Sequence, residues 1–380
     1  MPHPSAVQES GRLAHIARAR QTLLLDQPGT PVSVGLQPWI ERSWQRCLLA
    51  GKRPHDPVGF EAVSAPTMQR VTDESHALLR AARPVLSHMA HAMSATRYFA
   101  ILTDARGIVV DTAGPIDRRD RRATNIARIG VDLSEAAVGT TAIGATLSEQ
   151  QSVWLHRGEH FFADTAVYSC AGAPLFGPQG QCLGMLDLTG IEVPERPELQ
   201  HLVTQSAQTI ENALLLAQPH ALLLRLNWPG RALQMAEDGL VTLDADGHVI
   251  GSNRVARQLL PQPLGRGLGA LHAPALHASD LFALPWTHLF DTARHGGTAP
   301  LEVPLWSGLR VLALPSLPDH LADAGAHHAG AAPVDRTLRV AQTDLIRQTM
   351  AQTRGNVAEA ARILGISRAT IYRKLGQSAR

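Results

Sequence analysis

The sequence has few cysteines and no long apolar run, and each shortage excludes a class of protein. Its three cysteines, Cys47, Cys170 and Cys182, are odd in number and widely spaced among 380 residues. They predict a reducing compartment and no disulfide framework. The longest apolar stretch, residues 213–226, is interrupted by Pro219 and several polar residues. A membrane helix needs about 20 apolar residues, so we expect no membrane span.

The first residues also lack the features of a secretory leader, since no basic stretch precedes an apolar one. We therefore expect no signal peptide and a cytoplasmic protein. The hydrophobic fraction of 44% is that of a globular chain, and the formal net charge is only +2. A length of 380 residues predicts two or three domains.

Lysine is nearly absent, and this bears on nucleotide binding. Of 35 basic residues only Lys52 and Lys374 are lysines. A phosphate-binding loop of the Gly-x-x-x-x-Gly-Lys-Ser/Thr type needs a lysine that reaches the phosphates. Lys52 is followed by Arg53 and Lys374 by Leu375, so neither fits that motif. We expect no ATP hydrolysis by such a loop.

The hydrophobic periodicity predicts a multidomain α+β protein. Residues 1–66 form an N-terminal helical segment, and residues 67–226 form a sensor unit with flanking helices. Within the sensor unit we expect a helix at 67–96, a hairpin at 99–111, strands at 152–155, 171–176 and 182–188, and a closing helix at 197–216. Pro84 is a candidate for a kink in the first of these helices.

A second, weaker cycle of strands covers residues 232–314. Strands at 239–244 and 247–253 flank an Asp-Gly turn, a helix follows at 254–260, and strands at 302–306 and 310–314 complete the unit. Residues 315–336 are rich in Pro, Ala, Gly and His without periodicity, which predicts a linker. Residues 338–380 form the last domain, which begins with a helix at 338–353.

The C-terminal residues carry the most specific pattern in the chain. Asn356 with Glu359 forms a capping box, so a helix begins at Val357. Gly365 can end that helix in the left-handed conformation, and Ser367 caps a second one. Two short helices across a tight turn predict a helix-turn-helix.

Charge supports contact between this segment and nucleic acid. Residues 354–380 hold six Arg or Lys side chains against one Glu, a formal charge of +5. The segment resembles the C-terminal DNA-binding domain of the Fis family. The resemblance implies that Arg368 reaches base edges, while phosphates are held by Asn356, Thr370, Arg373 and Lys374. With Ser367, which caps the second helix, these residues are the predicted DNA-binding set.

Residues 39–47 and 98–190 resemble another family of bacterial regulators, the activators of acetoin catabolism. The resemblance is carried by residues 39–47, 130–135, 139–144, 158–161, 170–174 and 184–188. It implies that the sensor unit is a GAF domain. Residues 235–260 resemble the start of a PAS domain. Full-length members of the family also carry an ATPase of the AAA+ type, for which this sequence has neither the lysine loop nor the sigma-54-contacting Gly-Ala-Phe-Thr-Gly-Ala loop.

These patterns together predict a one-component transcription regulator and no enzyme. We expect it to bind double-stranded DNA as a homodimer, to respond to a small-molecule effector and to act on RNA polymerase without ATP hydrolysis or sigma-54 remodelling. The other hypothesis left open is an interaction protein that pairs with full-length activators of the family. We expect no cofactor and no membrane partner.

Candidate effector-pocket residues lie in the segments that resemble the GAF domain: Thr140, Glu159, His160 and Cys170. A metal site or a Cys/His nucleophile is the competing interpretation of Glu159, His160 and Cys170. Their spacing matches no recognised zinc motif, so we expect neither a metal site nor a catalytic site. Cys170 alone is either a redox sensor or a small buried hydrophobic residue, and the second is commoner.

Overall fold

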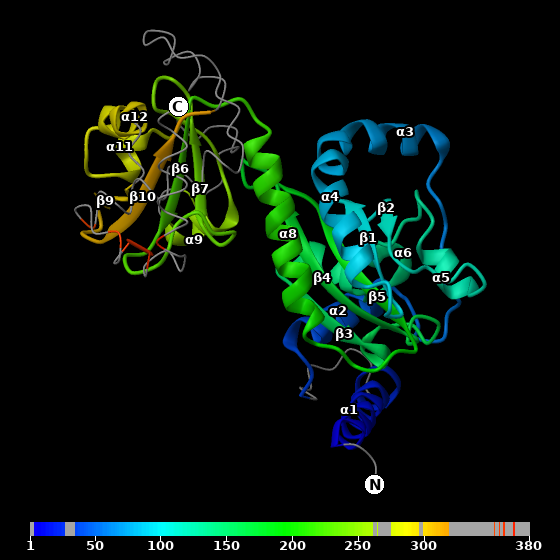
Figure 1. The fold of residues 1–380 in the computed structure, drawn as a ribbon. Coiled ribbons are helices and arrows are strands. Elements are labelled where there is room, and N and C mark those ends of the chain that lie inside the picture. Colours follow the sequence, from blue (N-terminus) through cyan, green and yellow to red (C-terminus); the bar gives the residue numbers. More distant parts are fainter. Residues whose placement is uncertain are drawn as a thin grey trace. The chain divides into compact units, whose positions relative to one another are not determined.

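The computed structural model describes residues 4–26, 35–260, 264, 275–295 and 299–318, together with Thr353, Val357, Ala360, Ala361 and Arg368. The chain divides into two units, Met1–Leu321 and Ala322–Arg380. The first unit contains two five-stranded antiparallel sheets with helices packed on them (Figure 1). This arrangement confirms a mixed class of helices and antiparallel strands.

The first sheet contains the hairpins that the sequence predicts. Its strands are β1 (Tyr98–Asp104), β2 (Val109–Ala113), β3 (Val153–His156), β4 (Tyr168–Phe176) and β5 (Cys182–Ile191). Their order in space is β2-β1-β5-β4-β3, and every neighbouring pair is antiparallel. The central strands β1, β4 and β5 are buried on both faces over most of their length.

An aspartate and a glycine fix the β1–β2 turn. One carboxylate oxygen of Asp104 accepts hydrogen bonds from the backbone N–H groups of Arg106 and Ile108, both at 2.9 Å. Gly107 has φ +90, a conformation that residues with a side chain rarely adopt. The second sheet repeats this turn with Asp244, whose carboxylate accepts from two backbone N–H groups at 3.0 and 2.8 Å.

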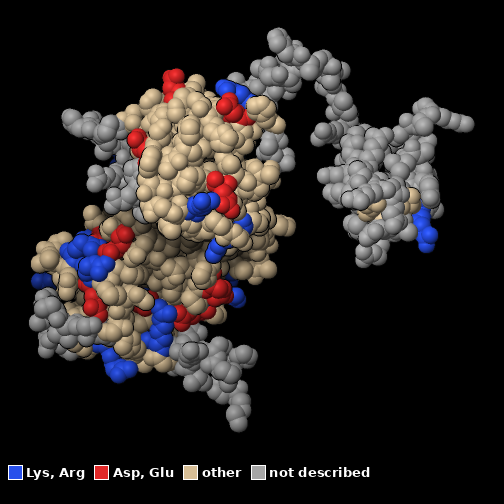
Figure 2. Space-filling model, turned by 90° about the vertical axis from the view of Figure 1, so that its left-hand side faces the viewer, with Lys and Arg blue, Asp and Glu red and all other residues tan. Residues whose placement is uncertain are grey.

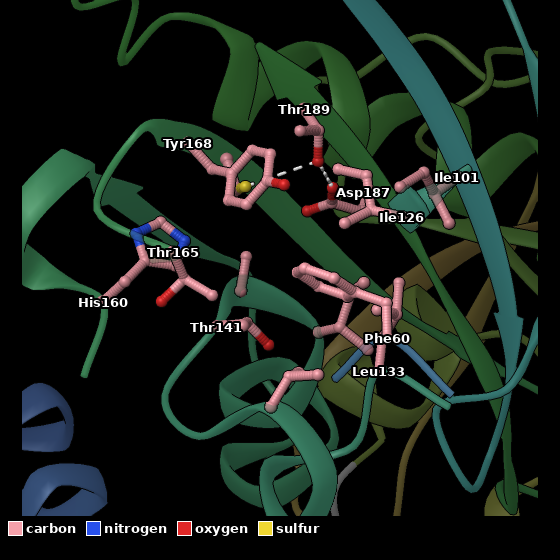
Figure 3. A pocket seen from close by; sticks show the side chains of 14 residues that line it. Phe60, Ile101, Ile126, Leu133, Thr141, His160, Thr165, Tyr168, Asp187 and Thr189 are labelled. Carbon is pink, nitrogen blue, oxygen red and sulfur yellow. Dashed lines mark hydrogen bonds between the residues drawn. The ribbon is translucent and has the colours of Figure 1, made fainter. Parts of the chain in front are cut away.

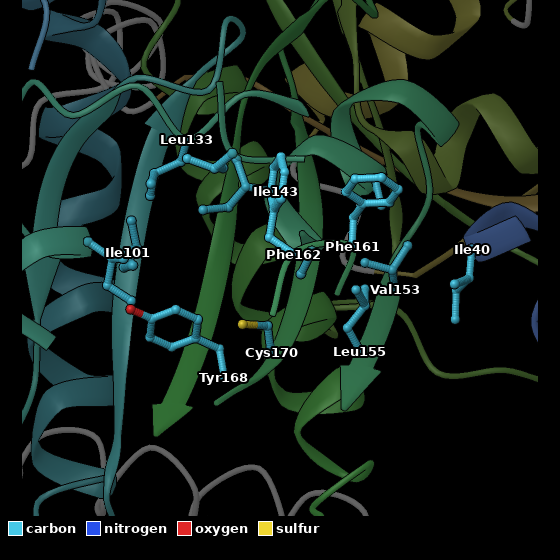
Figure 4. Close-up of a cluster of buried hydrophobic side chains, with 14 of the residues drawn as sticks. Ile40, Ile101, Leu133, Ile143, Val153, Leu155, Phe161, Phe162, Tyr168 and Cys170 are labelled. Atoms are coloured by element: carbon cyan, nitrogen blue, oxygen red, sulfur yellow. The ribbon is translucent and has the colours of Figure 1, made fainter. Parts of the chain in front are cut away.

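Helices cover both faces of the first sheet. On one face lie α4 (His76–Ala92) and α8 (Leu199–Leu216). On the other lie α2 (Pro38–Leu49), α5 (Arg121–Ile126), α6 (Glu135–Val138) and α7 (Ala142–Glu149). Successive side chains of β1 point to opposite faces of the sheet and so enter two hydrophobic clusters. Phe99 and Ile101 belong to the cluster that includes α2. Tyr98 and Leu102 belong to the cluster that includes α4. Figure 4 shows part of the first cluster, with Ile101 on β1 and Ile40 on α2 at its two ends.

The N-terminal segment packs onto the sheet. It consists of α1 (Pro4–Arg20), a π-helical turn, η1 (Gln21–Asp26), and α2. The buried side chains of Leu23, Ile40 and Trp44 belong to the same hydrophobic cluster as Phe161 and Cys170 of the sensor unit. The described residues of the N-terminal segment therefore contribute to the core of the first unit.

The helix expected at 67–96 is two helices. These are α3 (Ala65–Glu74) and α4, and they meet at Ser75, whose backbone angles of φ −90 and ψ 0 end one helix and begin the next. Pro84 lies inside the continuous helix α4, so the break falls at Ser75 and the proline does not interrupt the helix.

The second sheet contains one strand that the sequence analysis did not predict. Its strands are β6 (Leu222–Asn227), β7 (Gly239–Leu243), β8 (Val249–Ser252), β9 (Leu301–Pro304) and β10 (Arg310–Ser316), with the helices α9 (Arg254–Leu259), α11 (Ala278–Leu281) and α12 (Trp286–Arg294). The order is β8-β7-β6-β10-β9, so the unpredicted β6 is the central strand. Residues 222–226 of this strand were expected in the sensor unit of residues 67–226, but they belong to the second sheet. The strands expected at 239–244, 247–253, 302–306 and 310–314 correspond to β7 to β10.

Candidate effector-binding cavity and DNA-binding segment

A small cavity lies between the first sheet and the loops that cover it (Figure 3). Its volume is about 30 Å³, two to three times the ~10–15 Å³ that one buried water needs. Apolar side chains form much of the wall, including Phe60, Ile101, Ile126 and Leu133. The polar lining residues are Thr141, His160, Thr165, Tyr168, Cys170, Asp187 and Thr189.

The register of the sheet brings several of these residues together. Ile101 on β1 is the cross-strand partner of Asp187 on β5. Cys170 on β4 is the partner of Thr189, which lies two residues after Asp187. Because residues two apart on a strand share a face, these four side chains line one side of the cavity.

Most polar groups of the cavity already have partners. The Tyr168 hydroxyl donates to the carbonyl of Arg122 at 3.1 Å, and the Thr165 hydroxyl donates to a backbone carbonyl at 3.0 Å. Thr141 caps helix α7 and accepts from a backbone N–H at 3.2 Å. The Cys170 sulfur lies 3.3 Å from the Thr189 hydroxyl. These groups stabilise the wall and leave little capacity for a ligand.

His160 presents an unpartnered acceptor to the cavity. The His160 side chain and backbone are completely buried. Nδ1 lies 2.8 Å from the carbonyl oxygen of Arg157, and because a carbonyl only accepts, the hydrogen must be on Nδ1. Burial lowers the pKa of His160 to about 4, so the ring is neutral near pH 7. Nε2 then carries a lone pair, and it has no hydrogen-bond partner among the described residues.

Asp187 is the second group with an unpartnered atom. It is completely buried, and its Oδ2 accepts a hydrogen bond from the Thr189 hydroxyl. Burial raises the pKa of Asp187 to about 7, although the bond from Thr189 lowers it. Its Oδ1 has no partner among the residues that the structure describes. Figure 3 shows Asp187 and His160 on different sides of the cavity.

The four residues expected in an effector pocket divide into two pairs. His160 and Cys170 line the cavity. Thr140 and Glu159 are buried outside its lining, because their side chains bind the N-terminal helices. The Thr140 hydroxyl lies 2.7 Å from the hydroxyl of Ser43, and one carboxylate oxygen of Glu159 lies 2.8 Å from a guanidinium nitrogen of Arg12.

The loop that carries His160 is fixed by the same two helices. Four consecutive backbone carbonyls, those of residues 158–161, accept hydrogen bonds from Arg20 on α1 and Trp44 on α2. The bonds from Arg20 to the carbonyls of residues 158 and 161 are both 2.9 Å, as is the bond from the Trp44 indole to Glu159. The guanidinium of Arg20 also lies 5.7 Å from the Trp44 ring centre. The position of His160 therefore depends on the N-terminal helices.

The carboxylates of Glu135, Asp132 and Asp187 are held by different partners. Glu135 forms a two-pronged ion pair with Arg46, at 2.6 and 2.8 Å. Asp132 accepts from the backbone N–H of Ser134 at 2.9 Å. Asp187 alone of the three lines the cavity. The sequence placed Asp187 on a strand, but a strand buried on both faces gave no indication of which side chains point into a cavity.

Cys170 has the properties of a buried apolar residue. Burial raises the pKa of its thiol well above the ordinary value, with a further contribution from Asp187. The thiol is therefore protonated near pH 7 and a poor nucleophile. In the part of the chain that the structure describes, no group of three or more His, Cys, Asp or Glu side chains is arranged to hold a metal ion. Within those same residues, no helix has both the length and the apolar character needed to cross a bilayer.

Of the six predicted DNA-binding residues, the described part of the chain includes only Arg368, which is helical and exposed. The other five lie outside the described residues: Asn356, Ser367, Thr370, Arg373 and Lys374. Ala360 and Ala361, expected on the apolar face of the preceding helix, are helical and buried. On the face shown in Figure 2, basic and acidic side chains of the described residues are interspersed, without a large patch of one sign.

Two family models match the chain, one over the first sheet and its flanking helices and one at the C-terminus. Residues 15–212, just over half of the chain, match the model of the MimR N-terminal domain, and the chain belongs to that family. Residues 337–377 match the model described as bacterial regulatory protein, Fis family.

Named relatives are transcriptional regulators. The acetoin catabolism regulatory protein of Cupriavidus necator is 30% identical over 239 residues, which cover 61% of this chain and 36% of that protein. The propane 2-monooxygenase operon transcriptional activator MimR of Mycolicibacterium goodii is 30% identical over 200 residues, covering 52% and 33%. The chain thus spans about a third of the length of these relatives. Among solved structures, the E. coli DhaR(N)–DhaL complex is similar with 15% identity and a TM-score of 0.44, over 74% of this chain and 100% of that one.

Proposed function

We propose that this chain is a one-component transcription regulator, which binds specific DNA through its C-terminal helix-turn-helix and responds to a small effector in the first sheet unit. The proposal is carried by the Fis-family match over residues 337–377, together with six basic side chains against one acidic in residues 354–380. One helix-turn-helix contacts few base pairs, so we propose a homodimer on half-sites one helical turn (~34 Å) apart. A cytoplasmic location follows from the proposed target.

Replacing Arg368 with alanine should reduce discrimination between sequences. An arginine that contacts base edges contributes roughly 1–3 kcal/mol of preference for the correct base. Arg368→Ala should therefore weaken operator binding by that amount and leave binding to random DNA nearly unchanged. Lys374→Ala, which is proposed to remove a phosphate contact, should weaken both alike and reduce the salt dependence. Fluorescence anisotropy titrations at several salt concentrations measure these differences.

Equal losses on operator and random DNA for both variants would contradict the base-reading role of Arg368. Retention of full regulatory activity by a chain with both substitutions would favour the second function, an interaction protein that pairs with longer activators. Such pairing is supported by the match of residues 15–212 to the MimR N-terminal domain, since longer activators with that domain would share it.

We further propose that this chain neither hydrolyses ATP nor remodels a sigma-54 polymerase. The proposal is supported by the two lysines, which leave no lysine between residues 53 and 373 for a phosphate-binding loop. The purified chain should show no ATPase activity above that of a boiled sample, with or without operator DNA. ATP-dependent transcription from a sigma-54 promoter by this chain alone would show that the proposal is wrong. If the chain does not hydrolyse ATP, regulation proceeds by recruiting or blocking RNA polymerase.

A further inference from the structure

We propose that the cavity of the first unit binds a small uncharged molecule with a hydroxyl group, held between His160 Nε2 and Asp187 Oδ1. The inference deepens the proposed effector control and rests on it. These two atoms are the buried side-chain nitrogen and oxygen atoms of the cavity lining that lack a hydrogen-bond partner among the described residues. A buried polar atom without a partner is costly, so such atoms mark places where another molecule completes the bonding.

His160 requires a donor from the ligand. The hydrogen on Nδ1 is used on the carbonyl of Arg157, and the neutral ring leaves Nε2 as an acceptor. A carbonyl or ether oxygen cannot satisfy it, because two acceptors repel each other. A hydroxyl group can donate, and the remainder of a short molecule can then contact the apolar wall around Phe60 and Leu133.

Asp187 favours a hydroxyl group at the end of the ligand that lies away from His160, for a different reason. Its Oδ2 is occupied by the Thr189 hydroxyl, which leaves Oδ1 to face a ligand. Because burial raises its pKa to about 7, both the protonated and the ionised form occur near neutral pH. The protonated form donates and the ionised form accepts, and a hydroxyl group can satisfy both.

The lining of the cavity also disfavours a charged ligand. It contains no lysine or arginine, so a carboxylate or phosphate would lose its hydration without a counterion and would face Asp187. A cation would find one carboxylate that is only partly ionised and that Thr189 already engages. The volume of about 30 Å³ restricts the ligand to a few non-hydrogen atoms. Bound water is the competing occupant, since the cavity has room for it.

Calorimetric titration of the full chain with three matched probes tests the proposal. Propane-1,2-diol, lactate and 1-aminopropan-2-ol have the same three-carbon skeleton and differ in the charge of one end. The diol should bind with at least tenfold higher affinity than either charged probe. Equal or tighter binding of lactate or the amine, or no binding of the diol, would overturn the proposal.

Variants assign the binding to the two named atoms. His160→Phe and Asp187→Leu should each weaken diol binding about tenfold, the effect of losing one buried hydrogen bond. Asp187→Asn should restore affinity to within about threefold, because the amide can accept from Thr189 and donate to the ligand. His88→Phe, on the exposed surface of α4, is the matched control and should bind as the native chain does. Near-ultraviolet circular dichroism confirms that each variant is folded.

Undiminished diol binding by His160→Phe and Asp187→Leu would show that water alone occupies the cavity and that the diol binds elsewhere. A different result would contradict the proposed function. If operator affinity is the same with and without saturating diol, while the variants still lose diol binding, the ligand assignment stands and effector control is wrong. If the probes do not bind but operator binding is specific, DNA binding stands and the ligand assignment is wrong.

Discussion

Replacing Trp44 with alanine is expected to lower the free energy of unfolding of the first unit by about 4 kcal/mol. The Trp44 side chain is 1% exposed, and it belongs to the core cluster shared by the N-terminal helices and the first sheet. Its removal leaves a large cavity and also deprives the carbonyl of Glu159 of the indole donor at 2.9 Å. An unsatisfied buried carbonyl adds to the loss of packing.

Urea unfolding followed by circular dichroism measures the change. Leu49→Ala is the matched control, since Leu49 lies on the same helix α2 and is 87% exposed. Its effect should stay within about 0.5 kcal/mol. Trp44→Phe should give an intermediate loss, because the ring fills part of the space but donates no hydrogen bond. A loss below about 1 kcal/mol for Trp44→Ala would mean that α2 is not part of this core.

The same contacts give the N-terminal helices a place in the proposed sensing mechanism. They hold the carbonyls of residues 158–161, and His160 projects from that loop into the cavity. A ligand that shifts the position of His160 would therefore change the hydrogen bonds that Arg20 and Trp44 donate to this loop. Ligands shift an equilibrium only through differential affinity for its states, and this loop is where we propose such a difference arises.

Local patterns were sufficient to predict most of the strands. The Asp104 to Gly107 turn and its repeat at Asp244 each lie between two apolar runs with a period of two, and both are hairpins in the structure. Turn chemistry of this kind acts within a few residues, so it can be read from the sequence. The buried Ala360 and Ala361 followed likewise from helical spacing.

Strand β6 shows why other elements were missed. Its sequence, Leu222 to Asn227, is dominated by leucine, which favours helices, and it follows the helix α8. It is a strand because β7 and β10 pair with it on either side, and that pairing joins residues far apart in the chain. Tertiary pairing overrides local propensity here.

His160 and Cys170 were predicted and line the cavity, whereas Asp187 was not predicted there, for a related reason. Asp187 lies on a strand that is buried on both faces, so no alternation of polar and apolar residues reveals its direction. Glu159 and Thr140, also predicted for an effector pocket, contact Arg12 and Ser43 from a distant segment. The identity of a partner across 97 or 147 positions is a property of the fold and cannot be read from spacing.

Substitutions at His160 and Asp187 are expected to change the pH dependence of stability in opposite directions. Burial lowers the pKa of His160 to about 4, below the ordinary value of about 6.5. Between these values the unfolded state binds more protons than the folded state. The stability that neutral His160 contributes is therefore fully present above pH 6.5 and is lost as the pH falls to 4. The loss is about 3 kcal/mol, from about 1.36 kcal/mol per pKa unit.

Asp187 acts in the opposite sense. Burial raises its pKa to about 7, above the ordinary value of about 3.9, so the folded state binds the extra proton between these values. Its contribution is complete below pH 3.9 and is lost as the pH rises through 7, by about 4 kcal/mol. The two contributions therefore largely cancel over pH 4–7 in the native chain.

Each substitution should expose the contribution of the other residue. Relative to the native chain, His160→Asn should gain stability as the pH is lowered from 6.5 to 4, because its acid-labile group is gone. Asp187→Asn should lose stability over the same range, because protonation no longer stabilises its fold. Urea unfolding midpoints at half-unit pH steps measure both slopes, and His88→Asn on the exposed surface of α4 controls for the loss of a histidine. Differences from the native curve remove the contribution of groups common to all variants, among them His156, whose pKa burial also lowers to about 4. If the two variants change the slope in the same direction, the two groups do not titrate as buried residues of one cavity.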